Sequence, residues 1–281
     1  MPAAIMEGKS LAARILDQVR ARTEHMSERP GLALVALGDD PVSQRWEKSV
    51  KRDCRQCGIY CDTFRLPREL GWEELAGLVE FLNGRENMDG IQVLLPLADG
   101  QGEQAVLSAI RPDKDVDCLN PVSLGGLMAG APAFWPCVPG GVVRLLEEYG
   151  VDLTGRRCVV VGRSDLSERR QAILLLGREA TVTVCQAEAP GLAGACRQAD
   201  VLITAAGRPG LIPADWVKEG AVVVDAAFTP DARGQLCGDV VWEQVAPRAS
   251  YIAPVPGGVG PVIRAMLLEN TWKAALRHGK T

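Results

Sequence analysis

The stretch that decides the fold is an apolar run ending in a glycine and two polar residues, Arg157-Cys158-Val159-Val160-Val161-Gly162-Arg163-Ser164. Such a run is typical of a strand that is buried on both faces of a parallel sheet. Three further runs in the same half of the chain have this character: Thr181–Cys185, Asp200–Ala205 and Ala221–Ala226. Because buried strands alternate here with helix-like segments, we predict a Rossmann-type domain.

The first half of the chain also alternates between strand-like and helix-like patterns, as in an α/β protein. Helices are expected at Gly8–Thr23, Val42–Gln56, Trp72–Asn83 and Glu103–Ile110, and strands at Leu32–Leu37, Ile59–Phe64 and Gly90–Leu95. A Pro/Gly-rich stretch over Ala131–Gly141 then precedes a helix over Val142–Tyr149. We therefore predict two α/β domains, 1–140 and 141–260, and the last helix (261–278) could pack back on the first.

Composition excludes several classes of protein. The 281 residues carry a formal net charge of −4, so the basic surface of a nucleic-acid binder is not expected. No apolar run reaches the roughly 20 residues that cross a bilayer, and the N-terminus does not resemble a signal peptide. Nine cysteines, an odd number, suggest reduced thiols and a cytoplasmic location. Cys54, Cys57 and Cys61 lack a second pair or a nearby histidine, so we expect no metal site.

Three motifs could carry chemistry. Gly162 begins a junction where helix N–H groups could hold a phosphate, but Glu168 would place a carboxylate near it, and a plain turn is an equal alternative. In Lys114-Asp115-Val116-Asp117 only one carboxylate can readily face a pocket, and a solvated loop is the preferred interpretation. The loop Pro254–Pro261 is rich in Gly and Pro and would expose backbone donors to a flat ligand; a structural linker is the alternative, and the density of Gly and Pro favours a site.

Taken in order, several motifs resemble the bifunctional methylenetetrahydrofolate dehydrogenase/methenyltetrahydrofolate cyclohydrolases over nearly the whole chain. The motifs are 40–44 (DPVSQ), 89–91 (DGI), 95–97 (LPL), 111–117 (RPDKDVD), 136–139 (PCVP), 206–210 (AGRPG), 215–220 (DWVKEG) and the 254–261 loop. The resemblance implies a folate-binding N-terminal domain, a Rossmann domain that binds NADP or NAD, and a homodimer. It also implies that Asp117 binds the pteridine ring.

Apart from Asp117, which is kept, the residues that the resemblance makes catalytic are changed here. The family carries Tyr-x-x-x-Lys on the helix after residue 40, with the lysine central to the cyclohydrolase step, and these positions are Trp46 and Val50. Valine can neither donate nor accept a proton, and Lys51 is rotated by about 100° around the helix. The family glutamine before Leu-Pro-Leu is Leu94, although Gln92 could face the same side of the strand.

The remaining positions carried over from the family are binding residues. For the folate they are Trp46, Val50, Leu94, Leu95, Pro96, Asp117, Gly257, Gly258, Gly260 and Pro261, and for the cofactor Gly162, Arg163, Ser164, Glu188 and Phe228. Glu188 would repel a 2′-phosphate and suits a free ribose hydroxyl, which favours NAD over NADP.

These patterns support three hypotheses. The first is a dehydrogenase-like enzyme of this family whose cyclohydrolase activity is lost. The second is a non-catalytic descendant that binds a folate or a protein partner. The third is a Rossmann enzyme with a different substrate.

Overall fold

The computed structural model describes residues 3–95, 102–163, 165–231 and 233–281. The strands are β1 (Ala4–Ile5), β2 (Gly31–Leu37), β3 (Tyr60–Leu66), β4 (Gly90–Val93), β5 (Arg157–Gly162), β6 (Thr181–Gln186), β7 (Val201–Ala205), β8 (Val222–Asp225), β9 (Thr229–Pro230), β10 (Leu236–Cys237) and β11 (Tyr251–Ala253). The helices are α1 (Lys9–Thr23), α2 (Pro41–Gln56), α3 (Trp72–Asn83), α4 (Glu103–Ala109), α5 (Pro121–Met128), α6 (Cys137–Glu148), α7 (Asp165–Leu176), α8 (Leu192–Arg197), η1 (Ala214–Trp216, a 3₁₀ turn), α9 (Trp242–Val245) and α10 (Val259–Arg277).

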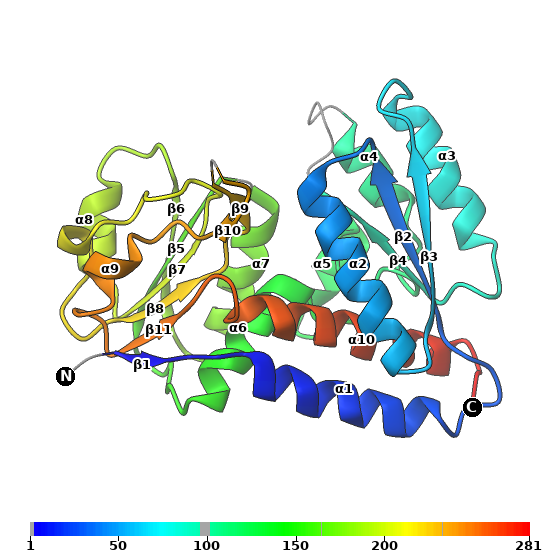
Figure 1. Ribbon diagram of the computed structural model, residues 1–281, viewed down its shortest axis with the longest axis horizontal. Coiled ribbons are helices and arrows are strands. Elements are labelled where there is room, and N and C mark those ends of the chain that lie inside the picture. Colours follow the sequence, from blue (N-terminus) through cyan, green and yellow to red (C-terminus); the bar gives the residue numbers. More distant parts are fainter. Residues whose placement is uncertain (1–2, 96–101, 164, 232) are drawn as a thin grey trace. The chain divides into compact units, whose positions relative to one another are not determined.

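The chain forms two compact units (Figure 1). One comprises residues 1–12 and 138–263, and we call it the unit of residues 138–263. The other comprises residues 13–137 and 264–281, and we call it the unit of residues 13–137. No helix in the described part of the chain is both long enough and apolar enough to cross a membrane.

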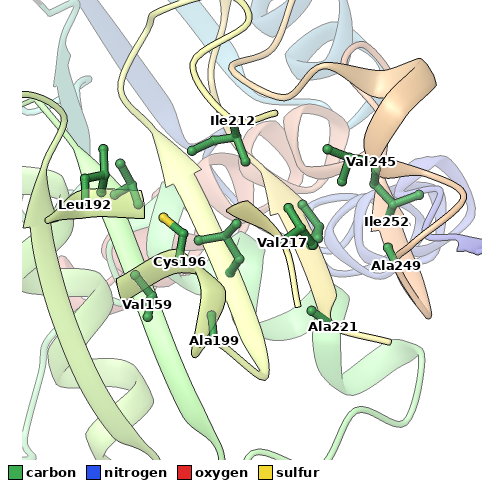
Figure 2. Packing of buried hydrophobic residues seen from close by; sticks show 13 residues of the cluster. Val159, Leu192, Cys196, Ala199, Ile212, Val217, Ala221, Val245, Ala249 and Ile252 are labelled. Atoms are coloured by element: carbon green, nitrogen blue, oxygen red, sulfur yellow. The ribbon is translucent and has the colours of Figure 1, made fainter. Parts of the chain in front are cut away.

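The unit of residues 138–263 is built on a parallel sheet, which confirms the α/β fold with a Rossmann-type domain. Its six strands lie in the order β1-β11-β8-β7-β5-β6. Figure 2 shows the buried cluster on which this unit is packed, with Val159 of β5, Cys196 of α8 and Ile252 of β11 among its members. The cluster is aliphatic, as expected from a chain that is only 5% aromatic.

The unit of residues 13–137 holds a three-stranded parallel sheet in the order β3-β2-β4. Its central strand β2 is buried along almost its whole length and pairs with β3 on one edge and with β4 on the other. The carboxyl ends of its strands meet at one edge, as in any parallel sheet, and α2 begins there, immediately after β2. This edge positions the site described below.

Two predictions about elements are wrong. The run Thr181–Cys185 was expected to be buried on both faces, but β6 is half-buried to exposed because it is the edge strand of its sheet. The Pro/Gly-rich stretch was expected to last to Gly141, but α6 already begins at Cys137. Pro139 is tolerated there because the first turn of a helix needs no backbone donor from it. Helix α5 begins at Pro121 with Asn120 as its N-cap and was not predicted.

Candidate functional site

Helix α2 presents the first residues of the site. Asp40 caps it by accepting a 2.7 Å hydrogen bond from the backbone N–H of Ser43, and Pro41 occupies its first turn. Trp46 and Val50 are four residues apart and therefore share one face of the helix. Trp46 is half-buried, whereas Val50 is 0% exposed. The family lysine position is thus filled by an apolar side chain inside the protein.

A chain of hydrogen bonds joins Trp46 to Asp117. The indole Nε1 of Trp46 donates to Oε1 of Gln92 at 3.0 Å, and Nε2 of Gln92 donates to Oδ2 of Asp117 at 3.1 Å. The backbone N–H of Cys137 donates to the other oxygen, Oδ1, at 3.0 Å. The fold therefore brings together two helices, a strand and a loop around one carboxylate, and we call this set of residues the Trp46–Gln92–Asp117 relay.

The chemistry of tryptophan fixes the direction of this relay. An indole N–H can only donate, so the Gln92 atom that faces it must be the carbonyl oxygen. The amide nitrogen of Gln92 must then face Asp117, which can accept. The donor and acceptor chemistry of Trp46 and Asp117 therefore requires the same orientation of the Gln92 amide that the structure shows. Among the described residues, Gln92 and the backbone of Cys137 each donate to one oxygen of Asp117, and a carboxylate offers roughly four acceptor positions.

The loop that carries Asp117 is buried, which corrects the expectation of a solvated segment. Lys114 is 5% exposed and Asp115 is 0% exposed. Nζ of Lys114 donates to the carbonyl of Arg85 at 2.7 Å, and Asp115 accepts from the backbone N–H groups of Leu119 and Asn120. Burial raises the pKa of the Asp115 carboxyl despite these bonds, and burial lowers the pKa of Lys114. This buried loop holds the backbone around Asp117 in place.

The lysines of α2 do not replace the missing family lysine. Lys51 is paired with Glu47 at 3.0 Å, and Arg65 of β3 pairs with the same carboxylate at 2.6 Å. Although burial opposes it, the bonds from Lys51 and Arg65 lower the pKa of Glu47. Lys48 is exposed. Within the described residues, no lysine nitrogen is bonded to Asp117. The pair Glu47 and Lys51 could have been found from its i, i+4 spacing.

The other predicted folate residues lie in two places. Leu94 is 8% exposed and directly follows β4, and Leu95 is half-buried. Pro96 lies outside the described residues. Gly257, Gly258, Gly260 and Pro261 belong to the unit of residues 138–263, so the structure does not place them in the relay.

Within its own unit, the 254–261 loop is packed rather than open. The N–H of Gly258 donates to the carbonyl of Pro254 at 2.8 Å, and the N–H of Gly8 donates to the carbonyl of Gly257 at 2.9 Å. A Cβ on Gly260 would lie 2.8 Å from the ring of Phe228. Gly258 and Gly260 therefore allow close packing of backbone and ring, a role that the sequence did not reveal.

The junction after β5 is filled by Glu168. A Cβ on Gly162 would lie 1.5 Å from Oε1 of Glu168, so the carboxyl group lies directly against the glycine. Glu168 is 2% exposed. Arg163 is exposed, Arg170 is buried, and Ser164 lies outside the described residues. A dinucleotide pyrophosphate needs the open face of such a glycine and carries negative charge itself. The residues present therefore do not fit that group well.

The end of β6 carries a second carboxylate. Glu188 pairs with Arg208 at 2.8 Å, and both side chains are exposed. The backbone N–H of Arg208 donates to Asp239, which also accepts from Thr204 and from the N–H of Ala206. Arg208 is thus held beside Glu188, and a ribose next to this pair would meet both a donor and an acceptor.

The cysteines considered for a metal site are packed as apolar residues. Cys54 and Cys57 are buried, and Cys61 is half-buried. Burial raises the pKa of Cys57 to about 11. Within the part of the chain that the structure describes, no group of three His, Cys, Asp or Glu side chains could hold a metal ion.

Comparisons with known proteins agree with this architecture. Residues 6–117 match the model of the tetrahydrofolate dehydrogenase/cyclohydrolase catalytic domain, and residues 136–279 match the model of the NAD(P)-binding domain of the same family. A protein named bifunctional protein FolD from Ruminiclostridium cellulolyticum is 44% identical over 98% of both chains. One of the same name from Moorella thermoacetica is 44% identical over 99% of this chain and 100% of that protein.

Solved structures give the same result. The bifunctional FolD dehydrogenase/cyclohydrolase of Campylobacter jejuni is 39% identical, covers 98% of this chain and 99% of its own, and superposes with a TM-score of 0.91. The Trypanosoma brucei enzyme, solved with NADP and an inhibitor, is 36% identical with a TM-score of 0.92 and covers 99% of this chain and 98% of its own.

Proposed function

Because the chain belongs to the tetrahydrofolate dehydrogenase/cyclohydrolase family of one-carbon metabolism, we propose that it binds a reduced folate through Asp117 and has lost the cyclohydrolase activity. The observation that carries this proposal is the fully buried Val50 at the family lysine position. Opening a methenyl bridge with water needs a group that accepts and returns a proton at the reacting centre. Neither Val50 nor Leu94 can do this.

The folate part of the proposal rests on Asp117. The pteridine ring of a folate presents an N–H and an amino group side by side, and a carboxylate can accept from both at once. The relay leaves Asp117 with free acceptor positions for such a pair. We propose that the unit of residues 13–137 with 264–281 carries this site and that the unit of residues 138–263 carries the nucleotide site.

For the nucleotide site we propose a weakened nicotinamide dinucleotide affinity, with NAD favoured over NADP. Glu168 supports the first part because its buried carboxyl group lies against Gly162. Glu188 supports the second because a carboxylate there repels a 2′-phosphate. We therefore expect dehydrogenase activity to be low compared with other members of the family.

A test of the lost activity is a double substitution, Val50→Lys with Leu94→Gln. A lysine at the buried position 50 would be desolvated, which lowers its pKa and favours the neutral amine that can accept a proton. We expect this variant to hydrolyse methenyltetrahydrofolate measurably faster than wild type in an absorbance assay. Val50→Leu with Leu94→Met is the matched apolar control. Equal turnover by wild type and the Lys/Gln variant would show that another residue handles the proton.

A second candidate is a non-catalytic protein that binds folate or a partner. The changes at Val50 and Glu168 favour it, because they affect both reactions of the family in two separate units. Calorimetry with NAD, NADP and 5-formyltetrahydrofolate, each alone, separates the candidates. Folate binding without dinucleotide binding would favour the non-catalytic protein, and dinucleotide binding without folate binding would favour a Rossmann enzyme with another substrate.

We further propose that the chain forms a homodimer through the unit of residues 138–263, as the family resemblance implies. The half-exposed edge strand β6 supports this, because its Val184 is 44% exposed in the single chain. An exposed edge strand with apolar side chains is a surface that proteins usually cover. Light scattering on the purified chain tests the assembly state.

A further inference from the structure

We propose that Gln92 is a positioning residue that, together with Trp46, orients the Asp117 carboxylate toward the ligand. This inference deepens the proposed function and rests on it, because it assumes that Asp117 contacts the pteridine ring. Gln92 contacts Asp117 through Nε2 at 3.1 Å and is 4% exposed. It is therefore a buried polar side chain whose amide hydrogen bonds are satisfied within the relay.

Strand geometry explains why position 92 can serve this role. Side chains two residues apart point to the same face of a strand. Gln92 lies within β4, whereas Leu94 lies just beyond its end. The family amide belongs at the position of Leu94. This chain carries an amide two residues earlier, at Gln92, on the same face of the strand, and has an apolar side chain at position 94. The amide remains directed at Asp117 from this earlier position.

The two oxygens of the Asp117 carboxylate accept hydrogen bonds from separate elements. Oδ1 accepts from the backbone of Cys137, at the start of α6, and Oδ2 accepts from Gln92. Cys137 is itself held, since its thiol donates to the carbonyl of Val116 at 3.4 Å and Asn270 donates to the same carbonyl at 2.8 Å. Two donors on different oxygens prevent the carboxylate from rotating. Each oxygen offers a second acceptor position, so a ligand with two parallel N–H donors could bond to both oxygens at once.

Trp46 completes the arrangement by anchoring the far side of the amide. Its N–H donates to Oε1 of Gln92 at 3.0 Å, which stops the amide from turning over and presenting its oxygen to Asp117. A reversed amide would place two acceptors against each other. Tryptophan at position 46 and glutamine at position 92 therefore act as a matched pair.

The experiment compares two probes by calorimetry. 5-Formyltetrahydrofolate carries both ring donors, and its 2-desamino analogue lacks the amino group. We expect Gln92→Leu to weaken the affinity for 5-formyltetrahydrofolate roughly tenfold or more, because the Asp117 carboxylate loses the hydrogen bond from Gln92 that holds its orientation. The same substitution should change the affinity for the 2-desamino analogue much less, because that ligand makes less use of the oriented carboxylate. A purely structural role would weaken both probes equally.

Two further variants keep the test decisive. Gln92→Glu has almost the same volume and still accepts from Trp46, but it places an acceptor against Asp117, so it should weaken the first probe at least as much. It carries the test if Gln92→Leu does not fold. Gln171→Leu, which replaces another buried glutamine in the other unit, should leave folate affinity unchanged. Thermal unfolding of each variant confirms that it is folded.

The outcomes separate this inference from the proposed function. If wild type binds 5-formyltetrahydrofolate and Asp117→Asn abolishes binding while Gln92→Leu and Gln92→Glu bind normally, the role of Gln92 is wrong and the folate site stands. Equal weakening of both probes by Gln92→Leu would also overturn it. If wild type does not bind 5-formyltetrahydrofolate, the proposed function fails and this inference fails with it.

Discussion

At the scale of single residues, Glu168 makes the clearest prediction. Its carboxyl group fills the space beside Gly162, so Glu168→Gly reopens that space. We expect NAD affinity, measured by calorimetry, to rise about tenfold, because the pyrophosphate can then approach the backbone of Gly162. Glu188→Gln is the companion variant and should improve NADP binding relative to NAD binding. Unchanged NAD affinity in Glu168→Gly would show that the dinucleotide does not approach Gly162.

Asp225 predicts a dependence of stability on pH. Burial raises the pKa of this carboxyl to about 7, and the nearby charge of Asp239 adds to the shift although Val240 and Ala227 donate to it. The folded state therefore keeps a proton between about pH 4 and pH 7 that the unfolded state has released. The stabilising contribution is complete below pH 4 and is lost as the pH rises through 7, by about 4 kcal/mol in all.

The comparison with Asp225→Asn isolates this effect, because asparagine mimics the protonated acid and does not titrate. We expect the difference in unfolding free energy between wild type and this variant to fall steadily from pH 4 to pH 7 in urea titrations. A difference that stays constant over this range would mean that Asp225 is ionised throughout.

Single residues also show how far the sequence could predict the site. Val50, Leu94 and Asp117 could be located from motif order alone, and the common strand face of Gln92 and Leu94 follows from the period of a strand. The bond between Trp46 and Gln92 could not be predicted, because it joins residues 46 positions apart whose approach depends on how α2 packs. The burial of Asp115 was missed for a similar reason, since its partners Leu119 and Asn120 form a local turn that no periodic pattern marks.

At the scale of elements, α2 carries the site and depends on its N-cap. Asp40 accepts from the N–H of Ser43 at 2.7 Å, which satisfies one of the unpaired donors of the first turn. We expect Asp40→Ala to lower the unfolding free energy by about 1 kcal/mol, measured as a shift of the urea midpoint at constant slope. Asp39→Ala, at the neighbouring exposed position, should change it by less than about 0.5 kcal/mol. An equal loss in both variants would argue against the cap.

Element boundaries show which local patterns predict structure and which do not. The apolar runs for β5, β7 and β8 were long and distinct, and the structure places strands there. The exposure of β6 was not visible, because an apolar run does not reveal whether a strand lies at the centre or the edge of a sheet. Helix α6 was predicted to begin too late because Pro139 and its neighbouring glycines resembled a linker, whereas proline is compatible with a first helical turn.

At the scale of the whole molecule, the C-terminal residues fasten the chain to the sheet of residues 31–93. Nζ of Lys280 contacts Asp89 at 2.9 Å, and both side chains are buried. Asp89 also accepts from the N–H of Gly31 and contacts His278. We expect Lys280→Met to destabilise the protein by about 3 kcal/mol, because it leaves a buried carboxylate with a lost partner.

The matched control is Lys273→Met, which removes a partly exposed pair with Glu269 within one helix. Such pairs contribute less than about 1 kcal/mol, so its unfolding free energy should stay close to that of wild type. The measurement is chemical unfolding at pH 7. A loss in Lys280→Met no larger than in the control would show that the C-terminal contact contributes little.

The fold of the molecule could be predicted from the sequence because many short motifs occur in the same order as in the family. Unrelated sequences rarely share so many motifs in one order. Composition alone gave only a general class. Contacts between distant segments, such as His278 with Asp89, remained out of reach because no local periodicity encodes them.

The relay has one more consequence, which concerns the movement of protons. A tyrosine hydroxyl at position 46 could pass a proton onward, because it both donates and accepts, but an indole N–H cannot accept one. Trp46 is therefore the last group of the hydrogen-bonded chain and can only donate, so no proton can leave the Asp117 carboxylate through Gln92 and Trp46. Any acid or base chemistry beside Asp117 would have to exchange its protons directly with the ligand or with solvent.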